Sequence, residues 1–160
     1  MPYLIEAAVA VLAVVLQVIL SNTLSVLGAV PDLALVYLMW VVIRRGQLPA
    51  ELIGFGLGLL VDILSSGALG SHSLTYTIVG FLLGYFSDAD QIEQRLRNWP
   101  FLLFVAAGTL LNGLIYYLLF KLTAGVSLED YFTGQIGLAT VYTTIVAIGP
   151  MFYASRRPLY

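Results

Sequence analysis

The sequence predicts an all-α integral membrane protein, a bundle of six transmembrane helices with both ends of the chain in the cytoplasm. Three observations support this fold class. The first is composition: 60% of the 160 residues are hydrophobic, only 10% are charged, and the mean hydropathy is +0.95. Soluble domains carry about 25% charged residues, so the solvent of this surface is expected to be a bilayer. The other two observations are the apolar segments and the placement of basic residues between them.

Six apolar segments approach the length of roughly 20 residues that crossing a bilayer requires. They are residues 4–22, 24–43, 49–66, 71–87, 99–122 and 131–155. Pro31 interrupts the second segment, and proline disfavours helix at the residue before it, so that helix can instead begin at Pro31. The loops are short, and we therefore expect residues 1–160 to form a single transmembrane domain.

The basic residues orient the segments. Six arginines fall on one side of a six-span topology, after the second, fourth and sixth segments: Arg44, Arg45, Arg95, Arg97, Arg156 and Arg157. Only Lys121 falls on the other side. Because basic residues concentrate in cytoplasmic loops, both termini are predicted to be cytoplasmic.

Several function classes find no support in the composition. The chain has no cysteine, which excludes disulfides, thiol catalysis and thiolate metal sites. His72 is the single histidine, and its neighbours Ser71 and Ser73 are expected to point elsewhere, so no nucleophile–base pair is evident. We therefore expect no enzyme activity, no metal and no cofactor. The net charge of −2 gives no indication of nucleic acid.

Small residues recur at helical spacing in the third and fourth segments. Gly54 and Gly58 are four residues apart, as are Gly80 and Gly84. Each pair forms a smooth face on a helix, which permits close backbone approach in lipid. The face could pack inside the bundle or receive the transmembrane helix of a partner, and the spacing leaves both interpretations open.

Each segment also places one polar residue in a common layer: Gln17, Asp32, Asp62, Tyr76, Asn112 and Thr144. At 1.5 Å per residue, Asp32 lies roughly 18 Å from Arg44, and Asp62 roughly 20 Å from Pro49. The layer is therefore displaced toward the outer face of a hydrocarbon core about 30 Å thick.

A charged residue facing lipid is costly, so Asp32 and Asp62 should face the bundle interior or a watery vestibule. Three interpretations stay open. The carboxylates could cap broken helices and join neighbouring ones. They could line an outward-facing pocket for a ligand or a lipid headgroup. They could also couple to protons or cations. No basic residue is predicted at their depth.

A pattern between Pro31 and Asp88 resembles the rod shape-determining protein MreD family. It comprises Pro31-Asp32-Leu33, the string from Gly54 to Asp62 (GFGLGLLVD), the turn Gly67-Ala68-Leu69-Gly70, then Leu74, Gly80 and Gly84. The resemblance implies a small, multi-pass protein of the bacterial cell (inner) membrane without enzymatic activity. It also implies a fold similar to that of the substrate-binding components of energy-coupling-factor transporters.

The resemblance further implies a function and partners. The family works in cell-wall elongation beside the bitopic protein MreC, and the chain is thus expected to be a scaffold that regulates rod shape. Further expected partners are an MreB-like filament, a wall glycosyltransferase and transpeptidase, and membrane lipids. The alternative is a vitamin-binding component of an energy-coupling-factor-type transporter, although the polar layer offers few groups to hold a small ligand.

Overall fold

A computed structural model describes the whole chain except residues 1, 24–28, 66–67, 88–91, 122–123 and 157–160. The described residues form helices and no strand. In chain order the helices are α1 (Pro2–Thr23), α2 (Leu33–Arg45), α3 (Gln47–Leu64), α4 (Ser71–Gly84), α5 (Ile92–Arg97), α6 (Pro100–Tyr116), the π-helix η2 (Tyr117–Lys121), α7 (Leu128–Tyr131), the π-helix η3 (Phe132–Ile136), α8 (Gly137–Val146) and α9 (Ile148–Arg156).

Among the described residues, two helical stretches are long and apolar enough to cross a membrane, Gln47–Leu64 and the continuous α6–η2 stretch Pro100–Lys121. Two further apolar helices are shorter, Glu6–Ile19 and Gly137–Tyr153. Each of the six predicted apolar segments coincides with a helical stretch over most of its described residues. The largest difference is at α2, which begins at Leu33, while residues 29–32 before it are not helical. Residues 24–28 lie outside the described part of the chain.

The core is built around α2. Leu33, Tyr37 and Trp40 form a partly exposed face of this helix. Eight of its thirteen residues are buried, and they cover the rest of its circumference: Ala34, Leu35, Val36, Leu38, Met39, Val41, Val42 and Ile43. A helix that is apolar all round is typical of a position inside a bundle. Accordingly, α2 contacts α1, α3, α4, α6 and α8.

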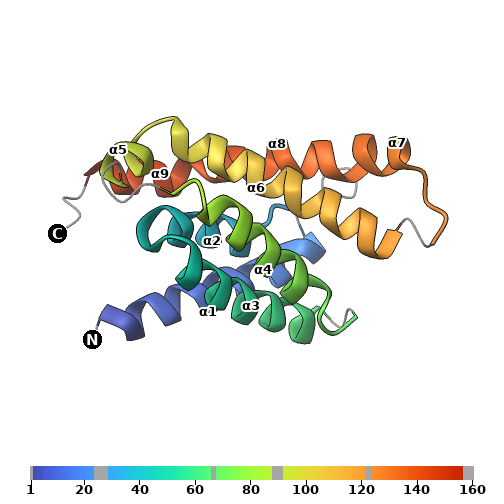
Figure 1. Ribbon diagram of the computed structural model, residues 1–160, viewed down its shortest axis with the longest axis horizontal. Helices are drawn as coiled ribbons and strands as arrows, with labels where there is room; N and C mark the ends of the chain where they lie inside the picture. The colour runs from blue at the N-terminus through green and yellow to red at the C-terminus, as the bar shows by residue number, and fades with distance from the viewer. Residues whose placement is uncertain (1, 24–28, 66–67, 88–91, 122–123, 157–160) are drawn as a thin grey trace.

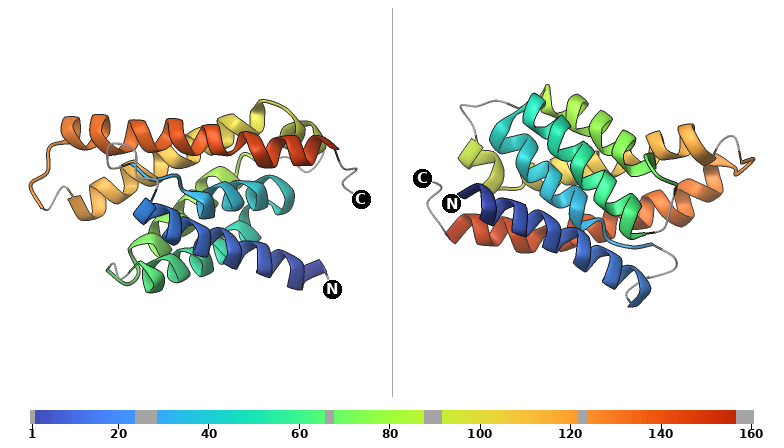
Figure 2. Two further views of the ribbon diagram at one scale, coloured as in Figure 1. Left: turned by 180° about the vertical axis from the view of Figure 1, so that it is seen from behind. Right: turned by 90° about the horizontal axis from the view of Figure 1, so that it is seen from below.

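The other helices surround α2 in two groups (Figures 1 and 2). Helices α1, α3 and α4 lie on one side, where α3 and α4 form the most extensive contact between any two of the described helices. The long α6 runs beside α8 and α9 on the other side. The beginning of α1 and the end of α9 lie at the same end of the bundle, together with the short helix α5 (Figure 1).

An ion pair joins two helices at that end. Arg45, in the last turn of α2, pairs with Glu6 of α1, and about a third of each side chain is exposed. Pairs this exposed contribute little to stability. The opposite end of the bundle, where α3 finishes and α4 begins, carries the polar layer.

Candidate functional site

Asp32 and Gln17 together cap the beginning of α2. The Asp32 Oδ1 accepts a hydrogen bond of 2.9 Å from the Leu35 backbone N–H. The Gln17 Oε1 reaches across from α1 and accepts one of 2.9 Å from the Ala34 backbone N–H. The first N–H groups of a helix have no partner within it, and here two of them are satisfied by side chains from two different helices.

Two more helices join this cap through Asp32. The buried Tyr76 of α4 donates its hydroxyl to both Asp32 carboxylate oxygens, at 2.7 and 2.8 Å. The Asp32 backbone N–H donates to the Thr143 Oγ1 of α8 at 3.0 Å. Asp32 thus connects α1, α2, α4 and α8, which makes it the central residue of the polar layer.

Thr144, which was predicted to belong to this layer, donates instead to the Thr140 carbonyl of its own helix at 2.7 Å. Its neighbour Thr143 is the fully buried residue that contacts Asp32. The two threonines are adjacent in the sequence and so differ little in depth along the helix, but consecutive helical residues point about 100° apart. Depth alone therefore could not choose between the two threonines.

Asp62 caps a different helix. It lies at the end of α3, is 1% exposed, and accepts backbone N–H groups from Gly70 at 2.9 Å, His72 at 3.1 Å and Ser73 at 3.3 Å. Gly70, with φ of +94°, precedes α4 in the left-handed conformation that favours glycine. A carboxylate at a helix N-terminus also benefits from the partial positive charge there.

Ser71 and His72 also bind Asp62, contrary to the expectation that the serine points elsewhere. The Ser71 hydroxyl donates to Asp62 Oδ1 at 3.1 Å, and His72 Nδ1 lies 2.8 Å from the same oxygen. Ser71 Oγ is 3.4 Å from that same ring nitrogen. In a Ser–His–Asp triad the serine and the aspartate face opposite ring nitrogens. The geometry here is that of a helix cap.

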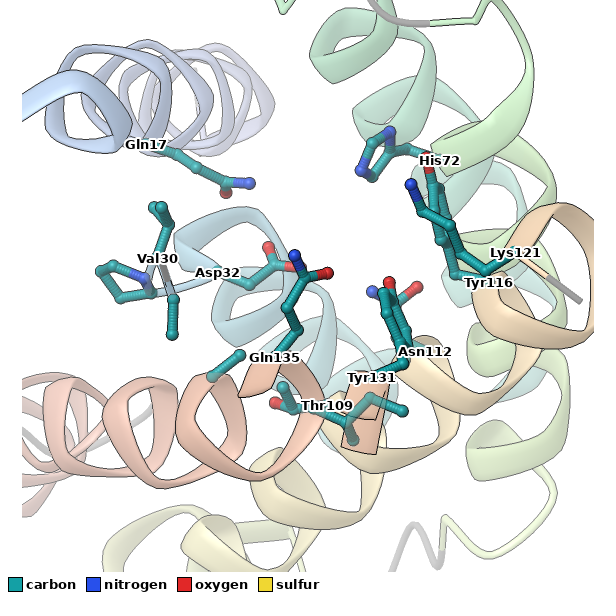
Figure 3. A pocket seen from close by; sticks show the side chains of 15 residues that line it. Gln17, Val30, Asp32, His72, Thr109, Asn112, Tyr116, Lys121, Tyr131 and Gln135 are labelled. Atoms are coloured by element: carbon teal, nitrogen blue, oxygen red, sulfur yellow. The ribbon is translucent and has the colours of Figure 1, made fainter. Parts of the chain in front are cut away.

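A pocket of about 320 Å³ opens beside the Asp32 cap (Figure 3). Gln17 and Asp32 lie on one side of it, and His72, Tyr116 and Lys121 lie on the other. Thr109, Asn112, Tyr131 and Gln135 complete its polar lining. Four of the six residues predicted for the polar layer are thereby placed at the pocket or at its Asp32 cap: Gln17, Asp32, Tyr76 and Asn112.

Most of the pocket lining on α6 and η2 was missed by sequence reasoning. Thr109, Asn112 and Tyr116 are spaced three and four residues apart, so they share one face of the helix, and this spacing was a usable signal. Lys121 was assigned only to the outer side of the membrane. The structure brings its ammonium to the pocket, 6.0 Å from the centre of the Tyr116 ring.

The four predicted packing glycines all lie in the contact between α3 and α4. A Cβ atom added at Gly54 would lie 2.8 Å from the Tyr76 carbonyl, and one at Gly58 would lie 2.4 Å from Ser73 Cα. A Cβ atom added at Gly80 would lie 2.8 Å from the Ala50 carbonyl oxygen, and one at Gly84 would lie 2.4 Å from Gln47 Cα. The two helices therefore approach backbone to backbone, and this face is occupied inside the bundle.

Comparison with models of protein families identifies the family of this chain. The family model described as rod shape-determining protein MreD matches residues 1–152. The chain belongs to the MreD family. Members of this family are membrane proteins that determine rod shape, and the MreD family is not a known enzyme family. Neither the curated proteins nor the solved structures contain a match to the chain.

The polar residues of the layer cap helices and join them to one another. Asp32 and Asp62 each begin a helix by capping it, and Gln17 and Tyr76 complete one of these caps. Such contacts fix the relative positions of four helices at one end of the bundle. The structural interpretation of the two carboxylates is therefore the one that their hydrogen bonds favour.

Proposed function

We propose that this MreD-family chain is a non-enzymatic, multi-pass scaffold of the bacterial cell membrane that regulates rod shape together with an MreC-like bitopic partner. The observation that carries the proposal is the family match over residues 1–152. The hydrogen-bonded caps support it, because they produce a rigid frame, and a scaffold needs a surface of fixed shape for its partner.

Six spans with cytoplasmic termini form part of the proposal. Support comes from the beginning of α1 and the end of α9, which lie at the same end of the bundle, as an even number of spans requires. Arg44, Arg45 and Arg95 belong to helices at that end, whereas Lys121 ends η2 at the other. The cytoplasmic end would then be the side available to an MreB-like filament.

Cysteine labelling tests this topology, since the chain has no native cysteine. A cysteine at Ser127, which is exposed just before α7, should react with a membrane-impermeant maleimide added to intact cells. One at the exposed Gln94 of α5 should react only after the cells are opened. The reverse pattern of labelling would contradict the orientation.

We further propose where the transmembrane helix of the partner docks. The glycine face between α3 and α4 is already filled, so it offers no docking surface. An apolar groove of about 400 Å³ instead runs over α2, between α1 and the α8–α9 stretch. Val9 and Ala13 form one wall, Val146 and Tyr153 the other, and Arg44 lies among the lining residues. In lipid, transmembrane helices associate through close packing of complementary surfaces rather than through hydrophobicity, and a groove offers such a surface.

Site-specific photocrosslinking tests this docking site. Probes at Val9 and Tyr153, both exposed beside the groove, should capture the MreC-like partner in growing cells. A probe at Phe55, which is equally exposed but lies on α3, is the matched control and should not. Probes at Leu69 and Val126 examine the outer rim, where a bitopic partner with a large outer domain would add contacts. Capture at Phe55 without capture at Val9 or Tyr153 would refute the groove as the docking site.

The wall glycosyltransferase and transpeptidase pair would join the same assembly through the partner. The proposal assigns them no surface on this chain, because its loops are too short to hold a soluble domain.

A further inference from the structure

The pocket beside the Asp32 cap contains a hydrogen-bond acceptor that the described part of the chain does not satisfy. The Asn112 Oδ1 is buried and has no hydrogen-bond partner there. The Asp32 carboxylate also lines the pocket, and the Leu35 N–H and the Tyr76 hydroxyl donate to it. Buried acceptors without donors are costly and uncommon in native proteins. These two acceptors make the pocket suited to a ligand that donates hydrogen bonds.

The pocket also carries positive charge, on the α6–η2 side where Asn112 lies (Figure 3). Lys121 is only partly exposed, and its ammonium lies near the Tyr116 ring. Within the described residues, ion pairs join Arg45 to Glu6 and His72 to Asp62, and none involves Lys121. An ammonium that is partly removed from water without a counter-ion favours an anionic ligand group.

We propose that this pocket binds a zwitterionic group in which a primary amine is joined to a phosphate. The amine would donate hydrogen bonds to Asp32 and Asn112, and the phosphate would accept them from Lys121. A carboxylate within the membrane region needs a cationic partner or a dense set of donors. Asp32 takes part in neither ion pair of the described residues, and the ligand amine would supply a cation in contact with it.

Two sources offer this chemistry. One is phosphatidylethanolamine, whose headgroup would enter from the outer leaflet. The other is a soluble aminoalkyl phosphate outside the cell, such as phosphoethanolamine. The proposal extends the scaffold function without resting on it, because partner capture and ligand binding are measured separately and either can fail alone.

Native mass spectrometry of the purified full-length chain tests the headgroup in the wild-type protein. Short-chain phosphatidylethanolamine should bind at least about tenfold more tightly than phosphatidylglycerol, which lacks the amine, or phosphatidylcholine, whose amine has no N–H donors. Phosphoethanolamine and glycerol phosphate form the soluble arm. Selective binding of phosphatidylethanolamine identifies a lipid, and selective binding of phosphoethanolamine alone identifies a soluble ligand. Equal binding of the three lipids without selectivity in the soluble arm, or no binding in either arm, overturns the proposal.

Variants assign the two ends of the ligand. Asn112→Leu should abolish the preference for the amine, yet unfold without ligand at the same or a higher temperature, because it removes an unpartnered carbonyl. Lys121→Met should weaken every phosphate-bearing ligand by about tenfold. Glu129→Gln, at an exposed position of α7 outside the pocket lining, is the control and should change nothing. An Asn112→Leu protein that is folded and still prefers the amine would contradict the assignment.

Discussion

Gly58→Ala is expected to destabilise the chain markedly, although it adds only one methyl group. The added Cβ would lie 2.4 Å from both the backbone nitrogen and Cα of Ser73, where no side chain can rotate away. Overpacking typically costs about 1–3 kcal/mol, and a backbone-to-backbone clash belongs at the upper end. Gly58→Leu should prevent α3 and α4 from meeting, and hence prevent assembly with a partner. Thermal unfolding in detergent measures both variants.

Gly56→Ala is the matched control on the same helix. A Cβ atom at Gly56 would meet nothing within 4 Å, so the substitution should be neutral or slightly stabilising through helix propensity. If Gly58→Ala and Gly56→Ala unfold at the same temperature as the wild-type protein, α3 and α4 do not approach as closely as described.

Asp62→Leu should have the largest effect of any single substitution at the polar layer. It would leave the N–H groups of Gly70, His72 and Ser73 without an acceptor at the beginning of α4. Each unsatisfied buried donor costs about 1–3 kcal/mol. We expect little folded protein to be recovered after detergent extraction, whereas Asp130→Asn, at an exposed acidic residue of α7, should be recovered like the wild type.

Asp62→Asn distinguishes a structural cap from ion coupling only when the hydrogen bonds to both Asp62 oxygens are taken into account. From the sequence, an amide that keeps the shape would be expected to retain function on the structural interpretation. The structure changes this expectation, because one Asp62 oxygen accepts Ser71 and His72 groups and the other accepts Gly70 and Ser73 N–H groups. Whichever of the two oxygens the amide nitrogen replaces, that nitrogen would face hydrogen-bond donors instead of an acceptor.

We therefore expect Asp62→Asn to lose about 1–3 kcal/mol of stability, less than Asp62→Leu, without any role for ion transport. The measurement is again thermal unfolding of the extracted protein. An Asp62→Asn protein as stable as the wild type would show that the cap does not use both oxygens.

Features that depend on the spacing of residues along one helix could be predicted from the sequence. The glycines four residues apart in α3 and α4 lie in a close helix contact, and Pro31 indicated that α2 could begin late. The predicted depths of Gln17, Asp32 and Asn112 bring all three to one pocket. These properties follow from the positions of the residues in the sequence together with the fixed rise and period of an α-helix.

Contacts between distant residues could not be predicted in this way. Tyr76 binds Asp32 across 44 positions of the chain, and Asp32 binds Thr143 across 111. Which face of each helix turns inward depends on all of its neighbours, and helical period gives no information about them. The same reason explains why Ser71 and His72 were not expected to join Asp62, and why Lys121 was not expected at the pocket.

Co-purification tests the central claim, that this MreD-family chain is a scaffold for an MreC-like partner, most directly. The chain and the MreC-like protein of the same cell would be co-expressed, extracted in mild detergent, transferred to lipid nanodiscs and isolated through a tag on the partner. The account predicts that the two proteins elute together in a constant ratio, and that Gly56→Ala preserves this ratio while Gly58→Leu abolishes it. Folded wild-type chain that elutes apart from the partner in both detergent and nanodiscs would contradict the account.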